Sequence, residues 1–146
     1  MSQYENILVA IDLGEDTASI LRRGLAFVSS NQIQLHLIHI IEPLSFAYGG
    51  DIPMDFSGIQ EEIHQQATQQ MRRVAEMHHI DEHHQHIVLG KPEIEIHAKA
   101  TELATDLIVV GSHGRHGLAL LMGSTANGVL HGATCDVLAV RVGHDV

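Results

Sequence analysis

The sequence predicts an α/β fold in which a five-stranded parallel sheet is covered by helices on both faces. Strand-like and helix-like segments alternate along all 146 residues, and the series begins and ends with a strand. Most strand segments are apolar at consecutive positions, which is typical of strands buried on both faces. The length suits one domain over residues 1–146, and no linker, tandem repeat or low-complexity tract divides the chain.

Two strands and one helix are expected in the first 41 residues. Asn6–Asp12 is an apolar run without alternation, which predicts a buried strand. The polar segment Gly14–Thr17 predicts a turn and a helix N-cap. Ile20–Val28 follows with apolar side chains at the spacing of an amphipathic helix, and Ile33–Ile41 predicts the second strand.

The middle of the chain contains an unusual segment and a long helix. Pro43–Gly58 holds two of the three prolines and three glycines, so we expect a long loop over one edge of the fold. Ile59–His78 is rich in glutamine and carries its apolar residues on one face, which predicts a helix.

The second half repeats the alternation of strands and helices. The predicted elements are a weak strand His83–Leu89, a helix Glu93–Ala104, an apolar strand Leu107–Gly111, a helix Gly123–His131 and a last strand Val137–Val142.

A candidate ligand site follows from this order. In parallel sheets, ligands bind beyond the carboxyl ends of the strands, near the point where the strand order reverses. Asp12, Ile40 and Gly111–Gly114 stand at such strand ends. Paired glycines let the backbone approach an anion, and Gly123–Thr125 opens a helix whose first amides can bind phosphate. Each of these residues also has a plain role, in a turn or as a helix cap.

Composition excludes several classes of function. Eight basic against 18 acidic residues give a net charge of −10, and tryptophan is absent, so we expect neither nucleic acid nor a membrane surface as a partner. The apolar runs are too short to span a bilayer, and the first residues lack the pattern of a signal peptide. A single cysteine, Cys135, is expected to be a packed, unreactive thiol. These features predict a cytoplasmic protein.

The 13 histidines invite a metal hypothesis, above all the cluster His78-His79 and His83-His84-His86. This cluster spans a helix end and a strand start and contains no cysteine, so we predict a hydrophilic, weakly pH-responsive surface and no metal site. His113 and His116 have no partner that would make them catalytic bases, and no catalytic residue is assigned.

Several motifs in sequence order resemble the universal stress protein family. They are Ile7–Asp12, Leu37–Ile40, Gly90–Pro92, Asp106–Gly114, Gly123–Thr125 and Cys135–Arg141, which together cover nearly the whole chain. The resemblance implies a flavodoxin-like or adenine-nucleotide alpha-hydrolase-like fold of five parallel strands. It also implies a homodimer that pairs the last strand with its mate, through Val137, Leu138, Ala139, Val140 and Arg141.

ATP, with or without Mg²⁺, is the cofactor that the resemblance implies. Nucleotide-binding members carry Gly-x-x-Gly, nine residues and then Gly-Ser or Gly-Thr, whereas here eight residues, Arg115–Met122, separate Gly114 from Gly123. By resemblance, Asp12 faces the adenosine end, Ile40 offers backbone groups to adenine, and the glycines hold ribose and phosphates. Arg115 is either a phosphate ligand or a solvated side chain. The candidate site comprises Ala10, Asp12, Ile40, Gly111, His113, Gly114, Arg115, Gly123, Ser124 and Thr125.

Three functions remain open at this point. The first is a cytoplasmic, dimeric, ATP-binding protein of stress response or signalling, with slow turnover at most, because no general base is evident. The second is a member that binds no nucleotide and acts through protein–protein interaction and its dimer surface. The third is an enzyme of adenine-nucleotide chemistry, for which the sequence offers neither catalytic residues nor a second domain.

Overall fold

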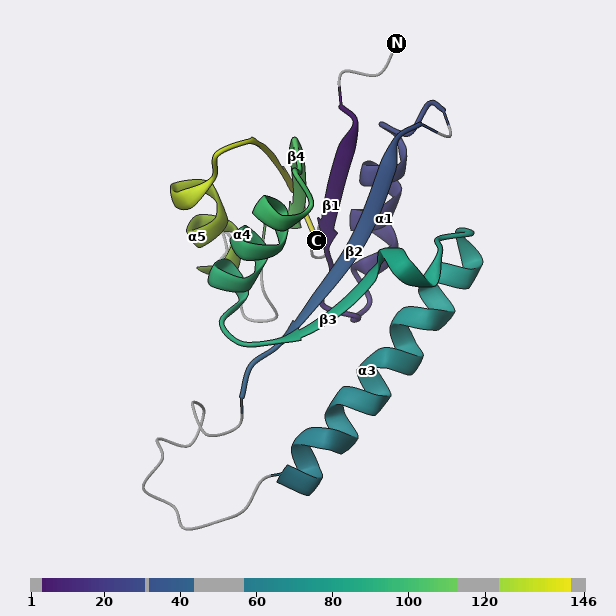
Figure 1. Cartoon of the computed structure of the whole chain (residues 1–146), viewed down its shortest axis with the longest axis vertical. Coiled ribbons are helices and arrows are strands. Elements are labelled where there is room, and N and C mark those ends of the chain that lie inside the picture. Colours follow the sequence, from purple (N-terminus) through teal and green to yellow (C-terminus); the bar gives the residue numbers. More distant parts are fainter. Residues whose placement is uncertain (1–3, 31, 44–56, 113–123, 143–146) are drawn as a thin grey trace.

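The computed structural model of the protein describes residues 4–30, 32–43, 57–112 and 124–142. Its five strands form one parallel sheet in the order β3-β2-β1-β4-β5 (Figure 1). The strands are β1 (Asn6–Ala10), β2 (Gln34–Ile41), β3 (Gln85–Leu89), β4 (Leu107–Gly111) and β5 (Asp136–Val140). The helices are α1 (Thr17–Leu25), α3 (Ser57–Met77), α4 (Pro92–Glu102) and α5 (Ser124–Gly132), with a 3-10 turn η1 (Glu82–His84). The predicted α/β class and the parallel sheet are confirmed.

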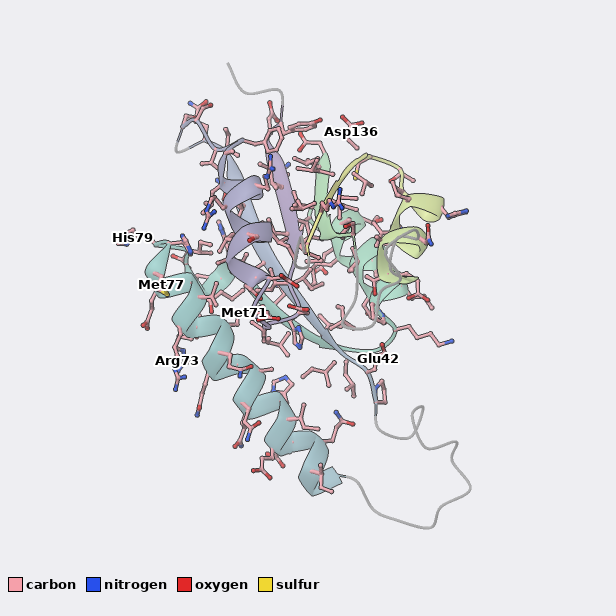
Figure 2. All side chains as sticks on the ribbon, turned by 180° about the vertical axis from the view of Figure 1, so that it is seen from behind. Glu42, Met71, Arg73, Met77, His79 and Asp136 are labelled. Carbon is pink, nitrogen blue, oxygen red and sulfur yellow. The ribbon has the colours of Figure 1, made fainter. Side chains whose placement is uncertain are left out.

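Helices cover both faces of the sheet, because the strands are apolar on both sides. One core packs α1 and α3 against the first face through Ile20, Leu21, Met71 and Ala75. On α3, Met71 points toward the sheet and Arg73 away from it (Figure 2). The other core packs α4 and α5 against the second face through Ile96, Ala100, Ala126 and Val129.

The element boundaries differ from the predicted ones by a few residues. β4 has the predicted bounds, whereas α1 begins at Thr17, three residues before the predicted start. The start of α1 is fixed locally, because the Thr17 amide donates to the Gly14 carbonyl at 3.2 Å and Asp16 takes the N-cap position without a side-chain hydrogen bond. The loop predicted over Pro43–Gly58 lies mostly outside the described residues, and Ser57 and Gly58 belong to α3.

All five strands run in the same direction, so the sheet has one carboxyl end and one amino end. Figure 2 shows the two ends through Glu42, which follows β2, and Asp136, which begins β5. The chain moves outward from β1 to β3 on one side and resumes at β4 on the other side of β1. The strand order therefore reverses between β1 and β4, where ligands bind in sheets of this kind. Within the described ranges, no helix is long and apolar enough to cross a membrane.

Candidate functional site

A cavity of about 250 Å³ opens at the carboxyl end of the sheet, at the reversal between β1 and β4. The strand ends of β1, β2 and β4 supply its floor, and the first turns of α4 and α5 supply its wall. It is lined by Ala10, Ile11, Asp12, Ile20, Ile38, His39, Ile40, Glu42, Pro92, Ile96, Val110, Gly111, Thr125 and Ala126.

Apolar side chains dominate the part of the cavity that faces α4 and α5. Ile38 and Ile40 of β2 point to this face, and Ile96 and Ala126 approach it from the two helices. Pro92 begins α4, where its fixed φ fits the first helical position and its missing N–H costs no hydrogen bond. The result is an apolar slot beside exposed backbone, which suits a flat, partly apolar ring.

Asp12 is the carboxylate at the polar side of the cavity. Its Oδ1 accepts a hydrogen bond from the Gly14 amide at 2.9 Å and lies 3.4 Å from the Thr17 hydroxyl. The first contact is the turn-stabilising role that the sequence allowed for Asp12. Since both of these contacts use Oδ1, the side chain is held in place while the exposed carboxylate still faces the cavity.

His39 is a cavity residue that the sequence analysis did not identify. Its Nδ1 donates to the Ile11 carbonyl at 2.8 Å, so this nitrogen carries the hydrogen and Nε2 is the acceptor in the neutral ring. The contact satisfies the carbonyl at the point where β1 leaves the sheet.

The backbone of Ile40 is directed past the end of β1. The Ile11 amide donates to the Ile38 carbonyl at 2.9 Å, which is the last backbone contact between these two segments. Backbone groups alternate between the two neighbouring strands, so those of Ile40 point to the same side as those of Ile38. Beside Ile40, β1 has already ended at Ala10. The carbonyl of the next residue, Ile11, accepts its hydrogen bond from the His39 side chain.

Gly111 ends β4, and its lack of a side chain has a packing reason. A Cβ at this position would stand 3.0 Å from Ile20 Cδ1 and 3.4 Å from Val142 Cγ2. The next residue, Ser112, has a buried hydroxyl with no hydrogen-bond partner in the described part of the chain. A buried hydroxyl without a partner is costly, and it stands beside the cavity residue Gly111.

The structure brings together five of the ten predicted site residues: Ala10, Asp12, Ile40, Gly111 and Thr125 all line the cavity. His113, Gly114, Arg115 and Gly123 lie outside the described residues, as does the whole segment of eight residues between the two glycines. Ser124 begins α5. The cavity adds Ile11, Ile20, Ile38, His39, Glu42, Pro92, Ile96, Val110 and Ala126 to the predicted set.

Two of the added residues had a sequence signal. His39 and Glu42 are polar residues at the end of a predicted strand, the same signal that selected Asp12. Ile96 and Ala126 had none, because an apolar residue on a helix gives no indication of which strand end it covers. Cys135 is half-buried, and burial raises the pKa of its thiol, in keeping with the predicted unreactive role.

Comparison with known proteins agrees with this architecture. The universal stress protein family is the family whose sequence model matches the chain, over residues 3–141. The universal stress protein A homolog 2 of Coxiella burnetii is 41% identical over 146 residues, which cover 97% of this chain and 98% of the homolog.

Solved structures share the fold. The hypothetical protein MJ0577, described in a structure-based assignment of biochemical function, superposes with a TM-score of 0.81 at 23% identity, covering 97% of this chain and 99% of that one. A universal stress protein in complex with cAMP superposes with a TM-score of 0.65 at 20% identity, covering 96% and 98%. Because its sequence matches the family model and a named relative over nearly the whole length, the chain belongs to the universal stress protein family.

Proposed function

We propose that this protein binds an adenine nucleotide, ATP first of all, in the cavity at the carboxyl ends of β1, β2 and β4. The observation that carries the proposal is the position of the cavity at the reversal between β1 and β4, with an apolar slot on one side and polar groups on the other. A member of the family with the same fold was solved with cAMP, which is also an adenine nucleotide.

The base would occupy the apolar slot. Ile38, Ile40 and Ile96 offer side chains to its two faces, and the backbone of Ile40 offers a donor and an acceptor to its edge. A purine needs this combination, because its faces are apolar while its edge hydrogen-bonds. A cavity of about 250 Å³ is at the small end for a ligand pocket, which favours burial of the nucleoside alone.

The ribose and phosphates would lie on the polar side. Asp12 can accept hydrogen bonds from ribose hydroxyls, and Thr125 in the first turn of α5 lines the same cavity, where helix amides are suited to phosphate. Within the described residues the buried Ser112 hydroxyl has no hydrogen-bond partner, and a ligand or its bound water would supply one. Gly114 and Gly123 remain predicted phosphate contacts, and Arg115 remains either a phosphate ligand or a solvated side chain. In the part of the chain that the structure describes, no three His, Cys, Asp or Glu side chains are placed to hold a metal ion, so Mg²⁺ would arrive with the phosphates.

Ligand identification tests the proposal. The protein is purified gently and denatured, and mass spectrometry identifies any released nucleotide. Emptied protein is then titrated with ATP, ADP, AMP and cAMP by calorimetry, with GTP as the control for the base and with Mg²⁺ present or absent. We expect binding of adenine nucleotides and none of GTP. An empty protein that binds none of them would overturn the proposal and favour the member that acts through protein contacts.

We also propose a homodimer formed through β5. This strand stands at the edge of the sheet, where its outer backbone groups can pair with a second copy. Leu138→Asp is expected to yield monomers in sedimentation. Leu25→Asp is the matched control, because Leu25 packs against the same core as Leu138 but belongs to α1 and not to the strand proposed to pair. A folded Leu138→Asp variant that still sediments as a dimer would place the interface elsewhere.

The cellular setting of this role remains the predicted one, a cytoplasmic protein of stress response or signalling. Fractionation of cells that produce the protein tests the location. We expect the nucleotide to act as a bound signal, and any hydrolysis to be slow.

A further inference from the structure

Three histidines from separate elements gather at the amino end of β2 and β3. The rings of His36 and His84 stack with centroids 4.1 Å apart, and those of His36 and His86 with centroids 5.1 Å apart. His36 Nδ1 and His86 Nε2 are 2.9 Å apart, which is a hydrogen bond. His84 Nδ1 donates to the Leu35 carbonyl at 3.1 Å. We call His36, His84 and His86 the imidazole cluster.

The imidazole cluster joins four elements. His36 belongs to β2, His84 to η1 and His86 to the edge strand β3. His36 follows the alternation of β2 and points to the face that α4 covers. The Lys99 ammonium and the Glu102 carboxylate, which form an ion pair at 2.9 Å near the end of α4, act electrostatically on His86.

The bond between His36 and His86 requires that at least one of the two rings is neutral. In the bond between His36 and His86, one nitrogen must donate and the other must accept. If both rings were protonated, two donors would face each other and two positive charges would lie within van der Waals distance. His84 stacks on His36, so a third ring lies against these two.

The surroundings favour neutral rings as well. Burial lowers the pKa of His36 to about 4, and His84, His86 and Lys99 add to the shift. Burial also lowers the pKa of His86; Lys99 acts in the same direction, and Glu102 opposes it. Of the charged side chains that act most strongly on His36 and His86, Lys99 disfavours protonation and Glu102 favours it.

We infer that the imidazole cluster is an acid-sensitive clasp, which holds η1 and the edge strand β3 against β2 and α4 while neutral and releases them when protonated. β3 has one neighbour in the sheet, β2, so this edge can open without separating the other strands. Opening would expose the backbone edge of β2, a new surface for pairing that exists only in acid.

The sign of the effect follows from linkage. In the open state His36 titrates near its ordinary pKa of 6.5, whereas in the closed state it titrates at about 4. Closure is therefore fully favoured above pH 6.5 and weakens as the pH falls toward 4. Between pH 7 and pH 5 we expect the opening constant of the clasp to rise about tenfold.

Amide hydrogen exchange between pH 7 and pH 5, corrected for the intrinsic pH dependence of exchange, tests the inference on the whole chain. We expect protection of residues 82–89 to fall about tenfold relative to β1 and β4. His36→Gln, whose side chain does not titrate, should remove most of this fall. His83→Gln is the matched control, because His83 is exposed in the same turn and has no ring contact within the cluster.

Two results would overturn the inference: protection of residues 82–89 that does not change with pH in the natural chain, or equal responses of the two variants. If His36→Gln does not fold, imidazole NMR titration of the natural chain decides instead. A pKa for His36 near 6.5 in the folded protein would then refute the clasp, and a value well below it would support the clasp.

Discussion

The polar groups at the two ends of the sheet differ in what they bond to. At the carboxyl end, Asp12 and Ile40 present groups to an open cavity, and the described residues use only part of their hydrogen-bonding capacity. At the amino end, the imidazoles of His36 and His86 bond to each other, and the Asp106 carboxylate accepts from the Glu5 and Asn6 amides at 2.8 and 2.9 Å. The polar groups of the carboxyl end are available to a ligand, whereas those of the amino end bond to one another. Substitutions at one end should therefore leave the properties of the other end unchanged.

A substitution in the core beneath both ends of the sheet has the largest expected effect, because it should lower the stability of the whole fold. Ile108 is fully buried in β4, between Leu8 of β1 and Val137 of β5. Ile108→Ala should lower the free energy of unfolding by about 2–5 kcal/mol, through lost burial and a cavity. Urea denaturation measures it. Val137→Ala on the half-buried edge strand is the control and should cost clearly less; equal costs would contradict the importance of the central strand.

Filling the cavity should affect the carboxyl end alone. Ala10 lines the cavity and points toward the face of α4 and α5, so Ala10→Phe would place a ring in the slot proposed for the base. We expect adenine-nucleotide affinity to fall at least about 100-fold, or about 2.7 kcal/mol, in calorimetric titration. Protection of residues 82–89 should keep its pH dependence.

Ala98→Phe is the matched control for that variant, because Ala98 is exposed on α4 outside the cavity. Unchanged nucleotide affinity in a folded Ala10→Phe variant would refute the proposed position of the base.

The carboxyl end was the more predictable of the two from sequence. Parallel strands bring their carboxyl ends together whatever their separation along the chain, so Asp12, Ile40 and Gly111 could be assigned to one site without knowledge of side-chain packing. Of the histidines predicted to form a hydrophilic surface, His79 and His83 are exposed, whereas His84 and His86 are half-buried in the imidazole cluster. The sequence did not connect His36 with them. His36 and His86 are 50 residues apart. Their contact depends on the register of β2 with β3, which pairs Ile38 with His86 and which no local pattern encodes.

Protonation of His36 at the amino end should lower the overall stability of the protein in acid. Because the pKa of His36 is lowered to about 4, the unfolded chain binds more protons than the folded chain as the pH falls from 6.5 toward 4. The free energy of unfolding should therefore decrease over this range. Between pH 7 and pH 5, the natural chain should lose about 1 kcal/mol more than His36→Gln in urea denaturation, after allowance for solvent screening. Parallel curves for the two proteins would mean that His36 titrates alike in both states.

The last two substitutions have the smallest expected effect, and they test whether the charges on α4 shift the pKa of His86 in the expected directions. Lys99 disfavours protonation of His86, and Glu102 favours it. Lys99→Gln removes a repulsive charge and frees the carboxylate, so the pKa of His86 should rise. Glu102→Gln leaves the ammonium unopposed, so the pKa should fall. Each shift should be roughly half a pH unit, because solvent screens the pair, and imidazole NMR titration resolves it. Nucleotide affinity should not change in either variant, since α4 meets the cavity at its other end, through Pro92 and Ile96. Shifts in the same direction would show that the ion pair acts on His86 through packing instead of charge.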